Sequence, residues 1–420
     1  MKTSNKKIIN YSLLISLSWK NIWRNKVRSG VILTAIALGL FAGTYLVAFM
    51  TGWMLDSTKT EIANHHSHVQ IHNRSFIANN DINGFMDREE VEKALQNSTF
   101  ANEMKISYRL SINGLLASAN NVTGISLKGV NTEEEKSVSN IWKCIPDTLG
   151  EFLPNDASMP IVISQKTAEK LKLKLKSKVV FTFADCNGDM QSIAFRVCGI
   201  FKTTNTLLDE NKVYVRYNDI FDLSALPPNA IHEVAITVKD LESCEILFPK
   251  ITALFPNLSV MDWRALSPLI AVSLDYMKYV VFIYIGIFLF ALSFGIINTM
   301  LMAVLERTRE LGMLGAVGMS KHKIFKMIML ETVFLTAVGS IAGILLAIIV
   351  IIPFMKSGID LTPILGGSFE EFGMGSVVYP LLTANMLIQI LLLVVVASIL
   401  SAIYPARKAL KLKPLEAIRV

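Results

Sequence analysis

Charged residues are scarce in this sequence of 420 residues. Asp, Glu, Lys and Arg make up 18% of it, and hydrophobic residues make up 52%, whereas a typical soluble domain has about 25% and about 45–50%. The deficit is concentrated in four long stretches that are almost free of charge. The remainder has the composition of an ordinary globular domain. This distribution argues against a wholly soluble protein and favours one that is anchored in a membrane.

The sequence also lacks the motifs of the common catalytic sites. It has no G-x-x-x-x-G-K-[ST] phosphate loop, no G-x-S-x-G, no H-E-x-x-H and no kinase signature. We therefore expect no catalytic residue, no cofactor and no bound metal in this chain, and we do not expect it to be an enzyme. Any energy for its function has to come from a partner.

Cysteine is rare as well, and no C-x-x-C pair occurs. The four cysteines are Cys144, Cys186, Cys198 and Cys244. They fall in a segment that the flanking charges place outside the cytoplasm, where an oxidising compartment permits disulfides. Cys186 and Cys198 flank one predicted hairpin but would not lie opposite each other across its turn. We expect small buried thiols, with disulfide bridges as the alternative.

The charge-poor stretches are long enough to cross a bilayer. They cover residues 31–50, 279–305, 327–352 and 377–404, and about 20 helical residues span a hydrocarbon core of about 30 Å. The first stretch resembles a cleaved signal peptide only superficially, because its positive and apolar regions are both too long. We predict four transmembrane helices, and the first, residues 31–52, is expected to be a retained anchor.

Basic residues flank these stretches on one side only. They lie before the first stretch, between the second and third, and after the fourth: Lys2, Lys6, Lys7, Lys20, Arg24, Lys26, Arg28, Arg307, Arg309, Lys321, Lys323, Lys326, Arg407, Lys408, Lys411, Lys413 and Arg419. The loop 354–376 has only Lys356 against Asp360, Glu370 and Glu371. Because positive flanks remain cytoplasmic, both termini are expected inside, in an inner-membrane protein with residues 53–275 in the periplasm. The net charge of +7 reflects this excess, and no nucleic-acid partner is expected.

The basic segment 1–30 also has an apolar periodicity. Ile15, Trp19, Ile22, Trp23 and Val27 recur at helical spacing, with Lys20, Arg24 and Arg28 opposite. A basic amphipathic helix with tryptophan suits the membrane interface. We predict such a helix on the cytoplasmic side, with a solvated positive tail as the alternative.

The outside segment has the pattern of an α+β domain. Strands are predicted at 69–72, 106–117, 122–130, 161–163, 179–183, 193–201, 213–217 and 234–238, and helices at 87–96, 166–174 and 241–255. We expect two subdomains, one made of 53–135 plus 230–265 and an outer one of about 140–225. The predicted fold class is thus an α-helical membrane protein with an α+β domain inserted between its first and second transmembrane helices.

Four histidines gather at the first predicted strand. They are His65, His66, His68 and His72, and three of them share one face at a period of two. Three imidazoles can bind zinc. No carboxylate or cysteine follows at ligand spacing, so an exposed polar strand face is the preferred interpretation.

The predicted spans contain almost no ionisable side chain. Ion-coupled carriers need such groups near the midplane of the membrane, beside broken helices. Glu331, near the cytoplasmic end of the third span, is the one candidate, and snorkelling or a contact to the neighbouring cytoplasmic helix is the preferred explanation. A secondary transporter is therefore disfavoured.

The cytoplasmic segment 306–320 has an amphipathic pattern of its own. Leu311, Leu314 and Val317 recur on one helical face, among Glu306, Arg307, Arg309 and Glu310. A short amphipathic helix between two spans can dock into a groove on a soluble protein. A solvated connector is the alternative.

Several motifs resemble the MacB/FtsX-type permeases of ABC transporters. GIINTMLMAVLERTRELGMLGAVG (295–318) resembles the second span and coupling helix of that family, and YPARKALKLKPLEAIR (404–419) resembles its closing motif. WKNIWRNK (19–26) is similar to its interface helix. SQKTAEKLKL (164–173) and VCGIF (197–201) are similar to its outer periplasmic subdomain.

The resemblance implies an FtsX-like permease domain at 276–420 and a MacB-like periplasmic core domain at 53–275. It also implies a pair of permease subunits, identical or different, and a dimer of ATPase subunits that bind ATP and Mg²⁺. The ATPase would dock on a coupling helix at 306–320, and its movement would travel along the helices to the outside domain. The residues implied in docking are Glu306, Arg307, Arg309, Glu310, Leu311, Leu314 and Val317.

Length and organisation most resemble the lipoprotein-releasing LolC/LolE permeases. This resemblance implies a lipoprotein substrate, a periplasmic carrier and contacts with membrane lipids. Phe49, Trp53 and Met54 are candidate acyl-chain contacts, with an aromatic interface anchor as the alternative. A MacB-like efflux permease for a periplasmic peptide or small molecule, and a regulator of a periplasmic hydrolase that moves no substrate, are the competing functions.

Overall fold

The computed structural model describes residues 14–203, 209–365 and 376–410. The chain forms two compact units. Unit 1 comprises Met1–Trp53, Asp275–Ile359 and Val378–Val420, and unit 2 comprises Met54–Leu274 and Asp360–Val377. Some residues used above to predict topology lie outside the described residues, namely Lys2, Lys6, Lys7, Glu370, Glu371, Lys411, Lys413 and Arg419.

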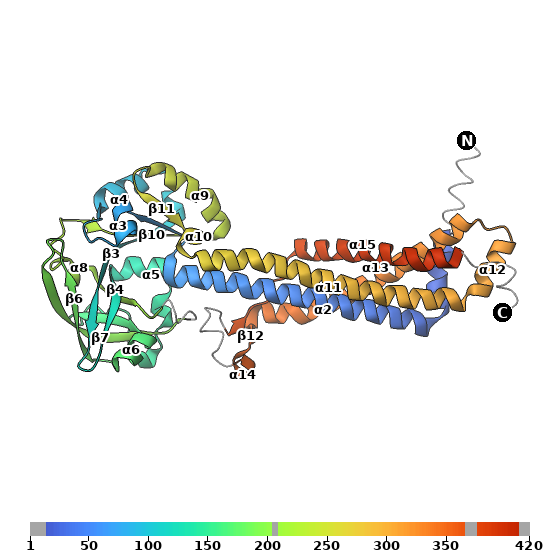
Figure 1. Ribbon diagram of the computed structural model, residues 1–420, viewed down its shortest axis with the longest axis horizontal. Coiled ribbons are helices and arrows are strands. Elements are labelled where there is room, and N and C mark those ends of the chain that lie inside the picture. The colour runs from blue at the N-terminus through green and yellow to red at the C-terminus, as the bar shows by residue number, and fades with distance from the viewer. Residues whose placement is uncertain (1–13, 204–208, 366–375, 411–420) are drawn as a thin grey trace. The chain divides into compact units, whose positions relative to one another are not determined.

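Four long helices make up most of unit 1 (Figure 1). They are α2 (Lys26–Glu61), α11 (Pro268–Glu306), α13 (Lys321–Ser357) and α15 (Ala384–Leu410). Among the described residues, these four are long and apolar enough to cross a membrane. The segment between the first and second of them forms a mixed α/β structure. The predicted fold class is confirmed.

Two predicted helix boundaries are wrong. The fourth span was predicted from residue 377, but α15 begins at Ala384, because Val377–Val378 form strand β13, paired with β12 (Ile359–Asp360). Pro380 lies between them, and proline disfavours helix at the preceding residue. The predicted coupling helix 306–320 is the shorter α12 (Thr308–Ala316), and α14 (Thr362–Leu365) was not predicted.

Two glycines let α13 approach α2 closely. A Cβ atom on Gly343 would lie 2.7 Å from the carbonyl oxygen of Ala37, and one on Gly339 would lie 2.8 Å from Ile36. Their G-x-x-x-G spacing places both on one helix face. In a bilayer, where no hydrophobic effect drives helices together, close backbone packing at small residues supplies much of the attraction.

Gly343→Ala should therefore destabilise the protein by about 1–3 kcal/mol, because its methyl group has no space against α2. Gly286→Ala is the matched control, since a Cβ there meets nothing within 4 Å, and it should be neutral or stabilising by up to about 1 kcal/mol. Thermal unfolding of the purified protein in detergent measures both. Equal melting temperatures for the two variants would contradict the packing described.

A separate helix at residues 14–24 precedes α2, with a bend at Asn25. Ile22 is buried in the core of unit 1, and the Ser18 hydroxyl donates a hydrogen bond of 3.2 Å to the Met327 carbonyl. Trp19 and Trp23 are half-exposed. Ile22 is therefore buried while the tryptophans on the same helix are half-exposed, and the predicted continuation of their face to Val27 ends at the bend.

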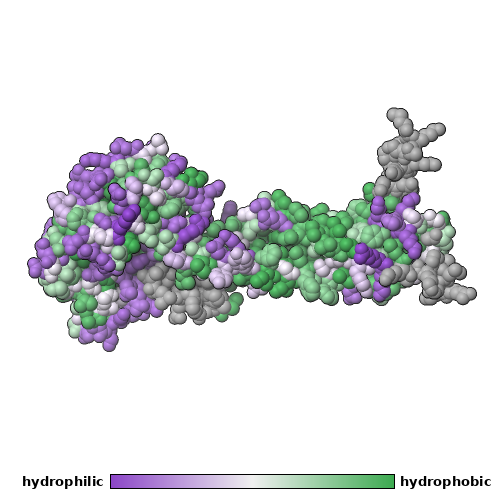
Figure 2. Space-filling view, turned by 45° about the horizontal axis from the view of Figure 1, so that its top comes forward, coloured by the Kyte–Doolittle hydropathy of each residue, from purple (hydrophilic) through white to green (hydrophobic). Residues whose placement is uncertain are grey.

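The surface of unit 1 separates by polarity (Figure 2). Its middle is mostly hydrophobic, and hydrophilic residues gather toward the end that carries α12. Basic side chains flank the helix ends on this side: Lys20, Arg24, Lys26, Arg307, Arg309, Lys321, Lys323, Lys326, Arg407 and Lys408. One end of the helical unit is thus strongly basic.

Within the described residues, nine strands of unit 2 form one sheet in the order β11-β1-β10-β3-β4-β8-β5-β7-β6. Their bounds are β1 (Val69–His72), β3 (Met104–Ala117), β4 (Val122–Val130), β5 (Pro160–Ser164), β6 (Lys178–Ala184), β7 (Met190–Phe201), β8 (Lys212–Arg216), β10 (Glu233–Val238) and β11 (Ser259–Asp262). Strands β2 (Met86–Asp87) and β9 (Ala230–Ile231) form a separate pair.

Part of this sheet closes into a barrel. The long strand β3 pairs with β10 and β4, and its last residues also pair with β6, where Leu116 lies opposite Phe181. Among the described strands, the closed set is β3-β4-β8-β5-β7-β6. A hydrophobic cluster that includes Leu116, Leu127, Phe181 and Phe195 fills it.

The predicted division of this domain is only partly correct. A second cluster, with Ile71, Val234 and Leu247, lies under β1 and β10, so two cores exist. However, residues 140–225 have no sheet of their own. Strands β3 and β4, assigned to the first subdomain by the sequence, belong to the barrel, because β3 is long enough to pair with β10 and also with β4 and β6.

The helices of unit 2 mostly begin at side-chain caps. Asp87, Ser164 and Asp240 accept hydrogen bonds from the first turns of α4, α6 and α9. The helix bounds are α3 (Arg74–Asn79), α4 (Arg88–Gln96), α5 (Thr132–Val138), α6 (Gln165–Leu171), α8 (Tyr217–Phe221), α9 (Leu241–Leu254) and α10 (Trp263–Leu266). Short 3₁₀ turns occur at Ala101–Glu103, Ile141–Cys144 and Asp147–Leu149, and a π turn at Ile62–His66.

The histidine and cysteine predictions have mixed outcomes. The expectation of an exposed polar strand face is wrong, because β1 lies between β10 and β11 and all four of its residues are buried. His65 and His66 lie in the π turn before it. Among the described residues, no group of three His, Cys, Asp or Glu side chains is arranged to hold a metal. All four cysteines are free thiols, and Cys244 is the fully buried one.

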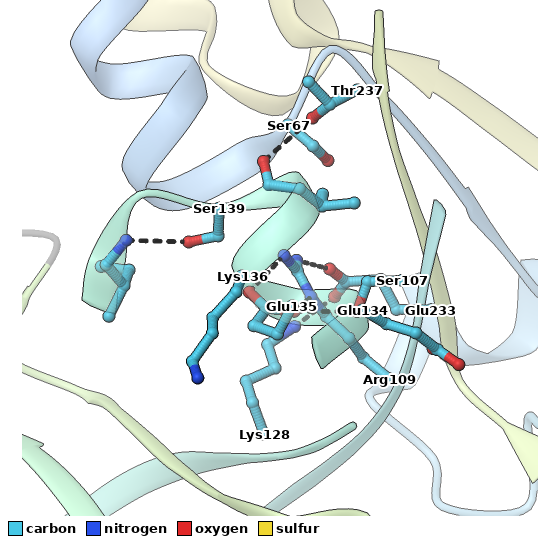
Figure 3. Close-up of polar contacts among 12 residues, drawn as sticks. Ser67, Ser107, Arg109, Lys128, Glu134, Glu135, Lys136, Ser139, Glu233 and Thr237 are labelled. Carbon is cyan, nitrogen blue, oxygen red and sulfur yellow. Dashed lines mark hydrogen bonds and ion pairs between the residues drawn. The ribbon is translucent and has the colours of Figure 1, made fainter. Parts of the chain in front are cut away.

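A buried arginine joins the parts of unit 2 (Figure 3). Arg109 on β3 donates two hydrogen bonds of 2.8 Å to Glu135 on α5 and one of 2.5 Å to Glu233 on β10. Lys128 on β4 pairs with Glu233, and Ser107 donates to Glu135 at 2.9 Å. Strand β3, which contributes to both cores, is thus tied to α5 and β10 by charge-assisted hydrogen bonds.

Arg109→Met should cost about 3–5 kcal/mol of unfolding free energy, because it removes the main cation from two buried carboxylates. The control is Arg264→Met. Its ion pair with Glu245 is half-exposed, and its loss should cost at most about 1 kcal/mol. Urea unfolding followed by circular dichroism compares them, and an equal loss in both variants would show that the Arg109 pairs do not stabilise the fold.

Candidate coupling site

The connection between α11 and α13 is built as a short helix with a defined end. Thr308 begins α12, and its hydroxyl donates a 2.6 Å hydrogen bond to the Leu305 carbonyl. After Ala316 the chain reverses at Gly318, whose φ of +99° lies in the left-handed region. The Met319 N–H donates to the Leu314 carbonyl at 2.9 Å, which is the Schellman closure. The helix therefore ends sharply at Gly318.

The two faces of α12 differ sharply in exposure. Leu311 is only 7% exposed and lies in the core of unit 1, and Leu314 packs against the same core. On the other side, Met313 is 50% exposed and Val317 is 89% exposed. An amphipathic helix that joins two apolar helices buries its own stripe against them. Leu311 therefore cannot belong to an outer docking face as predicted, whereas Val317 can.

A chain of ion pairs crosses this end of unit 1. Arg307 donates one hydrogen bond of 3.0 Å to Glu310 on α12 and two of 3.2 Å to Glu331 on α13. Arg24, from the helix at residues 14–24, pairs with the other oxygen of Glu310. Four charged side chains thus link three helices at the point where α11 ends.

The inner and outer pairs of this chain differ in strength. Arg307 and Glu331 are 13% and 5% exposed and lie among apolar residues such as Met300 and Ile328, so solvent screens their attraction little. Arg24 and Glu310 line a polar recess of about 560 Å³ that is open to water. Partial burial favours the neutral form of Glu310, but hydrogen bonds from Arg307 and Arg24 outweigh it and hold the pKa of Glu310 below its usual value.

The contact explanation for Glu331 is confirmed. Its carboxylate accepts both hydrogen bonds from Arg307, which directly precedes α12. Glu306 and Arg309 are exposed at the surface beside this pair. The sequence signal that would have found the pairing is the opposite charge of Arg307 and Glu331 at the two ends of segment 307–331, but the geometry of the pair depends on how α11 and α13 pack.

The candidate acyl-chain contacts do not form one surface. Met54 is 7% exposed, so the prediction that it faces lipid is wrong. Phe49 and Trp53 are half-buried and stack in a row along α2 with Phe41 and Tyr45, with ring centroids 6.0–6.3 Å apart. This i, i+4 row follows from the helical repeat and was not recognised in the sequence.

The part of the chain that contains this site matches a known family model. Residues 282–414 match the family model described as FtsX-like permease C-terminal. This part of the chain is an FtsX-like permease domain. It contains most of α11, all of α12, α13 and α15, and the whole ion-pair chain apart from Arg24.

Individual relatives extend this similarity. The lipoprotein-releasing system transmembrane protein LolC of Buchnera aphidicola is 21% identical over 387 residues, 90% of this chain and 90% of LolC. LolC of Neisseria meningitidis is 21% identical over 413 residues, 93% of each chain. The macrolide export ATP-binding/permease protein MacB of Vibrio parahaemolyticus is 32% identical over 125 residues, 30% of this chain and 16% of MacB. The predicted resemblance to MacB/FtsX-type permeases is confirmed.

Arg307→Met should lower the unfolding free energy by about 3 kcal/mol, because it removes the cation from the buried Glu331 carboxylate. Adding Glu331→Leu should recover most of this loss, since an apolar pair of similar size needs no desolvation. Arg309→Met, an exposed neighbour, should change stability by less than about 0.5 kcal/mol. Thermal unfolding in detergent tests all three, and no recovery in the double variant would contradict the pairing.

Proposed function

We propose that this chain is the permease subunit of an ABC transporter whose cytoplasmic ATPase docks on α12. The observation that carries the proposal is the two-sided helix itself. Its inner face is fixed to the helical unit by Leu311 and by the Arg307 ion pairs. Its outer face presents Met313 and Val317 to water, and exposed apolar side chains at the tip of a connection favour a protein partner.

The same contacts explain how movement would pass from the ATPase to the membrane helices. Arg307 bonds both Glu310 on α12 and Glu331 on α13, and it directly follows α11. A displacement of α12 would therefore move both helices rather than bend the connection. ATP and Mg²⁺ would be bound by the partner, and we propose a second permease subunit, identical or different, beside this one.

The basic end of unit 1 supports an orientation for the chain. Positive flanks remain cytoplasmic, so we propose that this end and both termini face the cytoplasm of a bacterium, in the inner membrane. The segment between α2 and α11 would then lie in the periplasm. Movement of α11 and α2 would act on that segment, which is mechanotransmission rather than alternating access.

We propose lipoprotein release as the transport function. The similarity to LolC supports this choice because it extends over 90% of this chain, whereas the similarity to MacB covers 30%. Within its shorter range the identity to MacB is higher, 32% against 21%. Export of a periplasmic peptide or small molecule is therefore the second candidate function. A regulator that moves no substrate and acts on a periplasmic hydrolase remains the third.

Val317→Asp and Met313→Asp should each prevent co-purification of the ATPase, because a carboxylate would be desolvated in an apolar groove. Val27→Asp is the matched control. Val27 is 80% exposed but lies on α2, and its substitution should leave the complex intact. Stable complexes of both α12 variants with normal ATP turnover would exclude α12 as the docking site.

Depletion of this subunit should retain outer-membrane lipoproteins in the inner membrane, as measured by membrane fractionation and immunoblotting. The control is re-expression of the wild-type chain and of Val317→Asp, of which only the first should restore localisation. Correct localisation during depletion, in a strain without a paralogous subunit, would reject lipoprotein release. Increased sensitivity to an exported compound in the same strain would then support the efflux function.

A further inference from the structure

The carboxyl end of α2 is an irregular turn in unit 2. After Glu61 the chain makes one π-helical turn, Ile62–His66. Ser67 then adopts a φ of 59°, and its N–H donates to the Ile62 carbonyl at 2.7 Å. π turns are rare, and a non-glycine residue at positive φ carries strain. Such a turn persists only where surrounding contacts hold it.

One of those contacts joins the turn to the barrel. His65 is 7% exposed, and its Nε2 lies 3.0 Å from the Thr203 hydroxyl and 3.5 Å from Asp209 Oδ1. Thr203 follows β7, and Asp209 precedes β8. The connection between two barrel strands is therefore attached to the end of α2 through these three side chains.

The hydrogen bonds determine which atom of His65 carries the proton. The Thr203 N–H donates to Asp209 Oδ2 at 2.9 Å, and the Thr203 hydroxyl donates to Oδ1 at 2.8 Å. A hydroxyl has one proton, and here the carboxylate accepts it. His65 Nε2–H must then be the donor to Thr203 Oγ1. The buried Nδ1 has no hydrogen-bond partner among the described residues.

Charged and titratable groups from several elements surround this relay. His66 lies 3.6 Å from Glu61 at the end of α2, and Lys212 on β8 faces both His65 and Asp209. The Cys144 thiol approaches Asp209 from the 3₁₀ turn at Ile141–Cys144. The network of Figure 3 and the neighbouring Tyr214 also act electrostatically on these groups. The residues concerned lie on β3, β4, α5, β8 and β10 and are Arg109, Lys128, Glu135, Tyr214 and Glu233.

We propose that His65, Thr203 and Asp209 are positioning residues that fasten the end of α2 to the barrel, so that displacement of this helix moves the barrel strands instead of deforming the π turn. The fastening stands on the contacts within unit 2. Its use in transport rests on the function proposed above. If these side chains were only a buried polar cluster with no fastening role, an apolar replacement of His65 would leave the amides of the π turn as well protected from hydrogen exchange as in the wild type.

The protonation of the relay supports this role and supplies a pH test. Burial raises the pKa of Asp209 to about 6. Burial, with Lys212 and His66 nearby, lowers the pKa of His65 well below its usual value. A raised carboxyl pKa means that the folded state binds the proton more tightly, so the Asp209 contribution to stability falls as pH rises from about 4 to about 6. The His65 contribution rises with pH up to about 6.5, because there the unfolded state binds the proton.

Hydrogen exchange of the full-length protein in detergent tests the fastening. His65→Leu should speed exchange of the Thr203 amide and of the amides of residues 62–67 by roughly tenfold or more, since the hydrogen bond to Thr203 and the contact with Asp209 are both lost. His65→Gln keeps a donor at the Nε2 position and should remain within about threefold of wild type. His232→Leu is the control, because the His232 ring bonds the Ser111 N–H and the Ile82 carbonyl instead, and it should not alter these amides.

Wild-type protection in His65→Leu would overturn the proposal, and so would exchange in His65→Gln as fast as in His65→Leu. In urea unfolding between pH 4 and pH 6, Asp209→Asn should make stability rise more steeply with pH than in the wild type. His65→Gln should make it rise less steeply. Identical slopes in the three proteins would contradict the protonation states assigned to His65 and Asp209.

The use of the fastening in transport is tested in the complex with the co-purified ATPase. ATP should change exchange in β7 of the wild-type complex, and His65→Leu should abolish this change while ATP hydrolysis continues. A β7 response unchanged in His65→Leu would overturn the coupling role. Failure of the wild-type chain to bind an ATPase would instead refute the proposed function. Whether His65 fastens the turn to the barrel would then be decided by the hydrogen-exchange experiment on the protein without the ATPase.

Discussion

A chain that crosses a bilayer must satisfy its backbone hydrogen bonds within its own helices, and unit 1 is organised around this rule. Its four long helices extend beyond the apolar stretches at one end or at both. Charged side chains follow the same rule. Arg307 and Glu331 lie against apolar helices as a hydrogen-bonded pair, close to the end of α11.

The connection α12 combines two requirements that usually conflict. For the proposed docking it would have to be attached firmly to the helices it joins and also expose enough apolar surface to bind a partner. The two requirements are met on different sides of α12. Leu311 and the preceding Arg307 contact the other helices, whereas Met313 and Val317 are exposed to water. The ion pairs add directionality that apolar contact lacks, because hydrogen bonds of fixed geometry resist sliding.

Unit 2 relies on buried charge in a comparable way. Arg109 neutralises two carboxylates on different elements. It lies on β3, the strand that pairs with β10 and also belongs to the barrel. The relay from His65 to Asp209 extends the same polar layer to the turn after α2. Such groups are costly to bury, and they specify one arrangement of strands and helix only when every partner is in place.

Length, charge and periodicity in the sequence were sufficient for the four membrane helices, most of the strands and helices of unit 2, and the amphipathic character of segment 306–320. These features depend on residues close together in the chain. The burial of Leu311, the pairing of Arg307 with Glu331, the closure of β3 on β6 and the contact of His65 with Thr203 were decided by tertiary structure alone. Each joins residues far apart in sequence, and periodicity can show that a helix has two faces but not which face its neighbours cover.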